Sequence, residues 1–512
     1  MSLIKFFTHR RRSIFTAGTD AVRADTWRPA VELWPAAAWS LTAAAALSMT
    51  LTAMTPPVPA LPMGLAAGVL GTLRLRSALG VLKDRAALAG SALELISSRS
   101  FARRLLRARR DMAGKGNKET FAPVWFGRGF DWGPEHAQKL YELSKIDVNR
   151  LLPARALCKL LTGTEPKDSR TVGLSAIDGL ESRKKDIWVS EKTLEGGTLI
   201  VGTTQAGKGV LLTSLVTQAI LRGEAVIVID PKMSSRLQNA VTAAAKLARR
   251  SPPLFFHPNH PEGLRINPLT HFERPSEIAS RITAVMSDSG PFTSFAWSAV
   301  NVVVDLLVHV GRTPSIATIE AVLTGDFEDL LLEAAELDCG EDYFDMLVSE
   351  AKVKGKKGRD GVLDVLERAK TEGRLSEATL KGAATYTHDP VHFAKITASL
   401  MPVLAMLTSG ALRQTLSPRD DDPIAMSLSE IIAQRKILYV CLNSLPDPTV
   451  AGAIGSMLLA DLASCAGERY NNTSISRNTV SLFVDECSNV AYKFSKNQVF
   501  PVVWAKLKDG IF

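Results

Sequence analysis

Residues 199–212 read LIVGTTQAGKGVLL: a short apolar run, a glycine-containing loop and the start of an apolar helical pattern. The spacing G-x-x-x-x-G-K from Gly202 to Lys208 is that of a Walker A loop, in which backbone N–H groups and a lysine hold nucleotide phosphates. Gly209 stands where the motif usually has the Ser or Thr whose hydroxyl binds Mg²⁺. The stretch therefore predicts a phosphate loop with one departure from the usual pattern.

The sequence around this loop predicts an α/β domain. Residues 196–202 are expected to form an apolar strand, and residues 209–223 have helical apolar spacing and end at a glycine. Residues 225–230 (AVIVID) are apolar almost throughout, as a strand covered on both faces should be. Strand, loop, helix and strand in this order are typical of the opening βαβ unit of a P-loop domain.

A second acidic motif lies far downstream, at residues 479–486 (TVSLFVDE). We expect a buried strand whose end brings Asp485 to Mg²⁺ through the metal's water shell and Glu486 to the attacking water. The alternative is a strand that simply ends in two exposed acids. Asp230 ends a neighbouring predicted strand, and ligands of α/β sheets gather at strand carboxyl ends. Asp230 is therefore expected either near the phosphates, with Lys232 close by, or as the cap of a loop.

ATP and Mg²⁺ are the cofactors that this pattern predicts. Lys208 and Glu486 are the expected catalytic residues, and Asp485 is the expected metal-binding residue. The expected nucleotide-binding residues are Gly202, Thr203, Thr204, Gln205, Ala206, Gly207, Lys208, Gly209, Val210 and Asp230.

Charge and cysteine content narrow the class of protein. The chain has 512 residues and a formal net charge of +9, which suits an anionic partner such as nucleic acid or the inner membrane leaflet. Its five cysteines are scattered without a CxxC pair, which favours reduced thiols over a disulfide framework or a zinc site.

An uncharged apolar stretch runs from Leu33 to Leu73. As a helix it would reach about 60 Å, enough for two crossings of a hydrocarbon core about 30 Å thick. Residues 55–62 (TPPVPALP) are expected to form the turn between a first span at 33–54 and a shorter second span at 58–73. Basic residues on both sides predict that both ends lie inside. A single span and a cleaved signal sequence remain alternatives.

Two basic segments outside the phosphate loop could bind an anionic partner. Residues 101–110 (FARRLLRARR) have helical spacing and would suit either anionic lipid or a solvated helix face. Residues 351–361 (AKVKGKKGRDG) lie in a helix-rich region at about 275–430 and would suit either a phosphate backbone or solvent.

Together these segments resemble the type IV coupling proteins of bacterial conjugation, and most closely the TraD-type factors of integrative elements, within the TraG/TraD and FtsK/HerA-like P-loop ATPases. The resemblance spans most of the chain. The segments that carry it are GRGFDW (127–132) followed by PEHAQ, GTTQAGKG (202–209), VIDPK (228–232), FFHPNHPEGLRINPL (255–269), residues 438–471 and LFVDE (482–486).

The resemblance implies a RecA-like core with an inserted all-α domain and a transmembrane hairpin in the bacterial inner membrane, the bulk of the chain being cytoplasmic. Such proteins are taken to work as hexamers that deliver relaxase-bound, single-stranded DNA to the channel of a type IV secretion system. Several of them carry Gly-Lys-Gly in the loop, so the resemblance implies that Gly209 is tolerated.

The resemblance also implies an organisation for the chain: a cytosolic N-terminal segment (1–32), a transmembrane hairpin (33–73), a juxtamembrane basic region (74–190), two parts of the RecA-like domain (191–275 and 430–512) and the all-α insertion between them (276–429). In the family, a further strand with a polar sensor residue follows the acidic strand, whereas here only a short stretch follows Glu486. We therefore expect a fragment or a truncated reading frame, with part of a sheet edge uncovered. A non-hydrolysing membrane docking protein and an FtsK-like DNA translocase are the alternative functions.

Overall fold

A computed structural model describes most of the chain. The described residues are 27, 29–51, 57–90, 100–105, 107, 124–163, 175–181, 184–194, 196–202, 207–286, 291–388, 398, 400–472, 478–487, 490 and 504–507. The chain forms two compact units. The first comprises Met1–Ser97, Trp125–Trp188 and Thr204–Ala206, and the second comprises Ser98–Val124, Val189–Thr203 and Gly207–Phe512.

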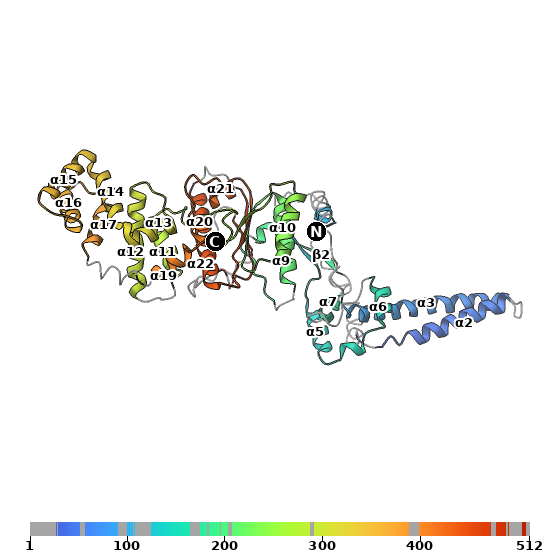
Figure 1. The fold of residues 1–512 in the computed structure, drawn as a ribbon. Coiled ribbons are helices and arrows are strands. Elements are labelled where there is room, and N and C mark those ends of the chain that lie inside the picture. The colour runs from blue at the N-terminus through green and yellow to red at the C-terminus, as the bar shows by residue number, and fades with distance from the viewer. Residues whose placement is uncertain are drawn as a thin grey trace, which may run out of the picture. The chain divides into compact units, whose positions relative to one another are not determined.

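The first unit begins with two long apolar helices that lie side by side, α2 (Leu33–Leu51) and α3 (Pro57–Ala87) (Figure 1). The expected turn at 55–62 is too long, because α3 already begins at Pro57 and Pro62 lies inside it. Pro57, the first residue of α3, fits the first helical turn, where backbone N–H groups have no partner within the helix, whereas Pro62 lies beyond that turn. Residues 52–56 lie outside the described part of the chain.

Small residues hold α2 against α3. A Cβ atom added to Gly71 would lie 3.1 Å from Ser40 Oγ, and one added to Gly64 would lie 3.1 Å from the Cβ of Ala46. Residues further along α3 thus face residues nearer the start of α2, so the two helices are antiparallel. Close approach through small residues is typical of helix pairs in membranes, where packing replaces the hydrophobic effect.

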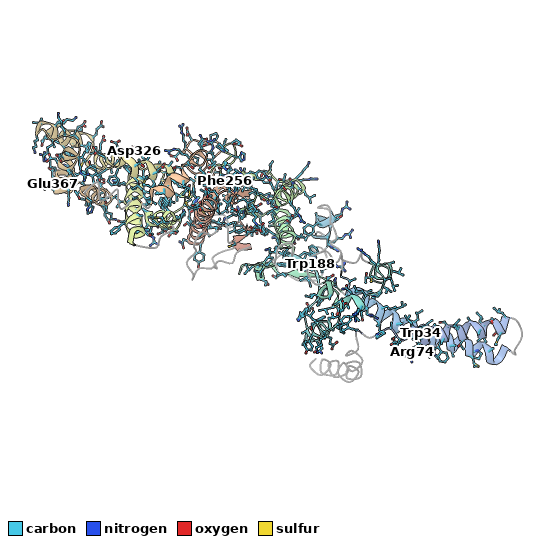
Figure 2. The ribbon with its side chains drawn as sticks, turned by 60° about the horizontal axis from the view of Figure 1, so that its bottom comes forward. Trp34, Arg74, Trp188, Phe256, Asp326 and Glu367 are labelled. Carbon is cyan, nitrogen blue, oxygen red and sulfur yellow. The ribbon has the colours of Figure 1, made fainter. Side chains whose placement is uncertain are left out.

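The outer surface of this hairpin is apolar. The side chains of Trp34, Leu41, Leu51 and Met63 are exposed, and Trp34 lies at the same end of the hairpin as Arg74 (Figure 2). The hydroxyl groups donate to carbonyls of their own helices at 2.7–2.9 Å, and they belong to Ser40, Thr42, Ser48, Thr50 and Thr72. The hairpin therefore has apolar side chains on its outer surface, and these hydroxyl groups form hydrogen bonds within their own helices.

The rest of the first unit is a small mixed module. Strands β1 (Val124–Gly129) and β2 (Lys185–Val189) pair with each other. The helical segments are α5 (Pro134–Leu143), η1 (Val148–Arg150), α6 (Arg155–Thr162) and α7 (Ser175–Gly179). Leu88, directly after α3, is buried in one apolar cluster with Leu143 and Leu180. The helix α3 thus runs from the hairpin into the core of this module.

The second unit contains a five-stranded sheet in the order β4-β5-β3-β6-β7. Its strands are β3 (Ala225–Asp230), β4 (Leu254–Phe256), β5 (Ile437–Cys441), β6 (Val480–Val484) and β7 (Trp504–Leu507). Strands β4, β5, β3 and β6 are parallel, whereas β7 pairs with β6 in the antiparallel direction. All residues of β3, β5 and β6 are buried, as their continuous apolar sequences predict.

Helices cover both faces of this sheet. On one side lie α9 (Lys208–Arg222) and α10 (Ser235–Leu247), and on the other α21 (Leu428–Ala433) and α22 (Pro448–Asn471) (Figure 1). Alternate residues of β3 supply the two faces, and Ala225, Ile227 and Ile229 belong to the cluster that contains α21 and α22. The described chain is therefore a mixed α/β structure with a mainly parallel sheet.

A run of helices separates β4 from β5 in the sequence. They are α11 (Pro275–Thr283), α12 (Pro291–His309), α13 (Ile316–Ala321), the π-helical turn η2 (Val322–Asp326), α14 (Phe327–Cys339), α15 (Glu341–Val353), α16 (Arg359–Thr371), α17 (Glu377–Thr387), α19 (Met401–Leu407) and α20 (Leu412–Leu416). Their buried apolar side chains form one continuous cluster with those of the sheet.

The structure corrects the predicted sheet in two ways. Residues 196–202 do not form a strand: Thr198 makes a single bridge, and Leu199 and Val201 are 51% and 80% exposed. The edge of β6 that faces away from β3 is instead paired with β7, so the described part of that edge is covered. The short strands β4 and β7 were not predicted, because strands of three or four residues give too little pattern to recognise.

Two helices in the described chain are long and apolar enough to cross a membrane, Ala60–Ala87 and Pro448–Asn471. The most apolar window of the first is 17% buried, whereas that of the second is 61% buried. The second helix is α22, whose residues Ala451, Ile454 and Leu458 pack into the core with the sheet. Its apolar composition is therefore explained by burial within the protein.

Candidate nucleotide-binding site

A helix begins at the end of the G-x-x-x-x-G-K sequence, as predicted. Gly207 has φ 94°, in the left-handed region that favours glycine, and it caps α9, which begins at Lys208. The Lys208 ammonium donates a 2.7 Å hydrogen bond to the carbonyl of Gly202, which ties the end of the loop back to its beginning. Thr203, Thr204, Gln205 and Ala206 lie outside the described residues.

Gly209 and Val210 lie in the first turn of α9. A Cβ atom at Gly209 would meet no atom of the described residues within 4 Å, so these residues leave room for a side chain. The Thr213 hydroxyl, one turn later, donates to the Gly209 carbonyl at 2.6 Å. The helix start therefore presents open space where a Walker A hydroxyl would stand.

Asp485 and Glu486 follow directly after β6, at the carboxyl edge of the parallel sheet. The backbone N–H of Asp485 donates to the Ile229 carbonyl at 3.0 Å, which places Asp485 level with the end of β3. Burial raises the pKa of Asp485, and the charges of Asp230 and Glu486 raise this pKa further, whereas the Lys208 ammonium lowers it. Lys208 and Asp485 thus interact electrostatically.

Asp230 caps the loop after β3. Its carboxylate accepts hydrogen bonds from the backbone N–H groups of Lys232 at 2.9 Å and Ser234 at 2.6 Å, and from the Tyr439 hydroxyl at 2.5 Å. Asp230 is fully buried, and burial together with this bond raises the pKa of Tyr439 well above its usual range. Asp230 therefore caps the loop after β3, which was one of the two alternatives. A nucleotide-binding role for Asp230 stays a prediction.

The contact between Lys232 and Glu486 could not be predicted from the sequence. The Lys232 ammonium donates to a Glu486 carboxylate oxygen at 2.6 Å, from a loop that is 254 residues away in the sequence. Tyr439 was also missed, since nothing distinguishes one tyrosine in an apolar strand from a core residue. The position of Lys232, two residues after the end of a predicted strand, did indicate that it lies near the carboxyl edge of the sheet.

Backbone strain marks the same edge of the sheet. Met233, Asn443 and Glu486 have φ angles of 58°, 52° and 43°, and they follow β3, β5 and β6. Residues other than glycine rarely adopt such angles, and clusters of them are typical of functional sites. Three adjacent parallel strands therefore end in strained turns at the edge that carries Asp485.

A second polar cluster lies apart from these acids. Among the described residues, His271, Asp461 and Cys465 have metal-ligand spacing, with ligand atoms within 4.8 Å of one another. However, the Arg281 guanidinium donates to Asp461 at 3.1 Å, and the backbone N–H of His271 donates to the same carboxylate at 3.1 Å. The Asp461 carboxylate is thus already engaged by a cationic side chain, and the cluster is part of a buried hydrogen-bond network.

The five cysteines are free, in agreement with the expectation from their spacing. No protein-family model matches the chain, and no curated protein matches it at a significant level. The functional interpretation therefore rests on the α/β fold, the apolar hairpin and the carboxyl edge of the sheet.

Proposed function

We propose that this chain is a membrane-anchored, DNA-dependent ATPase of the conjugative coupling-protein class. It would recruit a relaxase bound to single-stranded DNA and drive that DNA into a type IV secretion channel. The observation that carries the proposal is the electrostatic interaction of Lys208, from a G-x-x-x-x-G-K loop, with Asp485, which together with Glu486 follows a buried parallel strand.

The chemistry of these residues fits ATP and Mg²⁺. The N-terminus of the 15-residue helix α9 and the Lys208 ammonium supply positive charge for phosphates. Asp485 supplies a carboxylate for Mg²⁺, which prefers oxygen ligands and retains several waters. Glu486 supplies a carboxylate for polarising water. With a glycine at position 209, the Mg²⁺ site depends on Asp485, water and the nucleotide itself.

The hairpin α2–α3 supports an inner-membrane anchor. Its length suits a bilayer, its outer side chains are apolar, and the described hydroxyls donate within their own helices. Arg74 and Arg76, the first charged residues of α3, follow the apolar part, as positive residues on the cytoplasmic side do. The bulk of the chain would then lie in the cytoplasm.

The parallel sheet with helices on both faces supports a RecA-like core, and we infer that the helices between β4 and β5 are an inserted all-α domain. Its basic loop at 351–361 is partly structural: Lys356 pairs with Asp364 at 2.6 Å, and Arg359 donates to the carbonyl of Tyr386 at 2.6 Å. Exposed lysines remain for DNA or protein contacts. A homohexamer would supply the residues that a ring ATPase needs from a neighbouring subunit.

One observation favours a second candidate, a docking protein of the same system that does not hydrolyse ATP. Residues 196–202, which lead into the phosphate loop, are not part of the sheet, and Leu199 and Val201 are exposed. In P-loop proteins the strand before the loop fixes its position relative to the acids. Without that support, nucleotide binding without turnover is the expected behaviour.

DNA-stimulated ATP hydrolysis by the detergent-solubilised full chain tests the proposal, beside a Lys208→Ala variant. We expect single-stranded DNA to raise the wild-type rate and the variant to lose both hydrolysis and binding of a fluorescent ATP analogue. Equal background rates with Lys208-dependent binding would favour the docking protein. Equal binding by both proteins would reject the nucleotide site.

A further inference from the structure

We propose that the Lys232–Glu486 ion pair is an autoinhibitory contact that holds the water-polarising carboxylate in a resting arrangement until a triphosphate draws Lys232 away. This inference rests on the proposed ATPase function and adds a regulatory residue to the same site. It makes Lys232 a positioning residue that acts through Glu486.

The contact occupies the group that the reaction needs. Lys232 Nζ lies 2.6 Å from Glu486 Oε1, so an ammonium stands against the carboxylate that would otherwise orient a water molecule. A general base must itself lie within hydrogen-bond reach of the water whose proton it takes. While the ion pair persists, that carboxylate oxygen is engaged by Lys232.

The backbones on both sides of the pair are fixed. Lys232 follows Asp230, whose carboxylate accepts hydrogen bonds from the N–H groups of Lys232 and Ser234. Glu486 has a strained φ of 43°, and its N–H donates to the side chain of Asp485 at 3.0 Å. The turn that Glu486 adopts is thus held in place while the ion pair itself depends only on two side-chain ends.

The pair is also easy to open. The Lys232 side chain is 47% exposed and that of Glu486 is 33% exposed, so solvent and ligands reach the contact. Exposed ion pairs are weak, because water screens them and both side chains lose freedom. The four-carbon stem of a lysine lets its ammonium move to a new acceptor while the backbone stays in place.

The charges of the site indicate what opens the pair. Of the described lysines, Lys208 and Lys232 interact with the acids at this edge, and both are engaged within the protein: Lys208 donates to the Gly202 carbonyl and Lys232 to Glu486. Three carboxylates, those of Asp230, Asp485 and Glu486, surround Lys232 electrostatically. A bound triphosphate adds strong acceptors for ammonium groups. It therefore competes with Glu486 for Lys232, and transfer of Lys232 to a phosphate oxygen frees the carboxylate.

The test compares Lys232→Met in the full chain with Lys246→Met, a control on the exposed surface of α10. We expect Lys232→Met to raise ATP hydrolysis in the absence of DNA by about two- to fivefold, the factor that corresponds to an exposed ion pair. Lys232→Arg, which keeps the positive charge, should restore the low basal rate.

An unchanged basal rate in Lys232→Met, or a loss of hydrolysis, overturns the autoinhibitory role, provided that thermal unfolding shows the variant to be folded. The wild type could bind ATP without hydrolysing it. In that case, a Lys232→Met variant that also fails to hydrolyse ATP overturns the autoinhibitory role. Binding of a fluorescent ATP analogue separates these results from failure of the ATPase proposal. A site that is wrong altogether shows no Lys208-dependent binding, whereas a wrong inference about Lys232 leaves that binding intact.

Discussion

The Arg281 guanidinium donates a 3.1 Å hydrogen bond to the carboxylate of Asp461, and both side chains are almost completely buried. Arg281 belongs to α11, in the helical run, and Asp461 belongs to α22, which covers the sheet. Asp461 also accepts a 3.1 Å hydrogen bond from the N–H of His271, and Ser464 accepts one of 2.6 Å from Arg281. A buried ionic network therefore joins the helical run to the helix layer of the sheet.

Removal of one partner should destabilise the second unit strongly. Asp461→Ala leaves a buried guanidinium without its carboxylate, and such a change costs about 3–5 kcal/mol. The free energy of unfolding, measured with denaturant, checks this. The double variant Arg281→Met/Asp461→Leu replaces the pair by apolar side chains and should be less destabilised than Asp461→Ala. A double variant that is equally or more unstable would contradict this account of the network.

Asp485→Asn should stabilise the protein in the absence of Mg²⁺. Burial and the charges of Asp230 and Glu486 raise the pKa of Asp485, so the folded state binds its proton more tightly than the unfolded state does. The resulting stabilisation is present below the unfolded-state pKa and is lost as pH rises through the raised folded-state pKa. The gain of Asp485→Asn should therefore be larger at pH 7.5 than at pH 4.5.

Thermal unfolding midpoints in the presence of EDTA measure this gain. Asp421→Asn, at an exposed position, is the control and should change the midpoint little at either pH. A lower midpoint for Asp485→Asn at neutral pH would mean that the carboxylate supports the fold rather than serving a ligand. The same variant should lose Mg²⁺-dependent nucleotide binding.

Gly71→Leu should loosen the helical hairpin. Even a Cβ atom at this position would lie 3.3 Å from the backbone N of Ser40, so a larger side chain pushes α2 and α3 apart. We expect a loss of about 1–3 kcal/mol, the usual cost of overpacking a close contact. Thermal unfolding of the hairpin in detergent micelles measures it. Gly80→Leu, also in α3 but with no atom near its added Cβ, should leave stability unchanged or raise it.

Gly209→Ser should strengthen the dependence of nucleotide binding on Mg²⁺. The position has room for a side chain, and a hydroxyl there matches the usual Mg²⁺-binding group of a phosphate loop. Titration of Mg²⁺ against binding of a fluorescent ATP analogue should show half-saturation at a lower Mg²⁺ concentration. Gly209→Ala gives a similar gain in helix propensity without the hydroxyl, so equal shifts in both variants would rule out a role for the oxygen.

The sequence predicted elements whose apolar pattern is long or continuous. The strands β3 and β6 and the helix α9 lie where their patterns placed them, because burial on one or both faces imposes that pattern. The strand expected at 196–202 was wrong. An apolar run joins a sheet only where a neighbouring strand has a free edge, and the local sequence pattern does not record whether such an edge exists.

The site was predictable as far as the phosphate loop and the acidic strand go. Gly207, Lys208, Asp485 and Glu486 stand in recognisable motifs, and the parallel sheet puts both acids at one edge. The Lys232–Glu486 pair was not predictable, because it joins two loops through side-chain ends. The left-handed backbone of Glu486 also leaves no trace in the sequence, since that conformation usually calls for glycine.

The helix α3 joins the apolar hairpin to the folded module of the first unit. It is continuous over 31 residues, about 46 Å, and its end packs into the core of the module that contains Leu143 and Leu180. Because no loop separates the hairpin from the module, a rotation or tilt of the hairpin also rotates or tilts the module. In the membrane anchor that we propose, the hairpin would therefore be a rigid mount rather than a flexible tether, and it would set the direction in which that module faces.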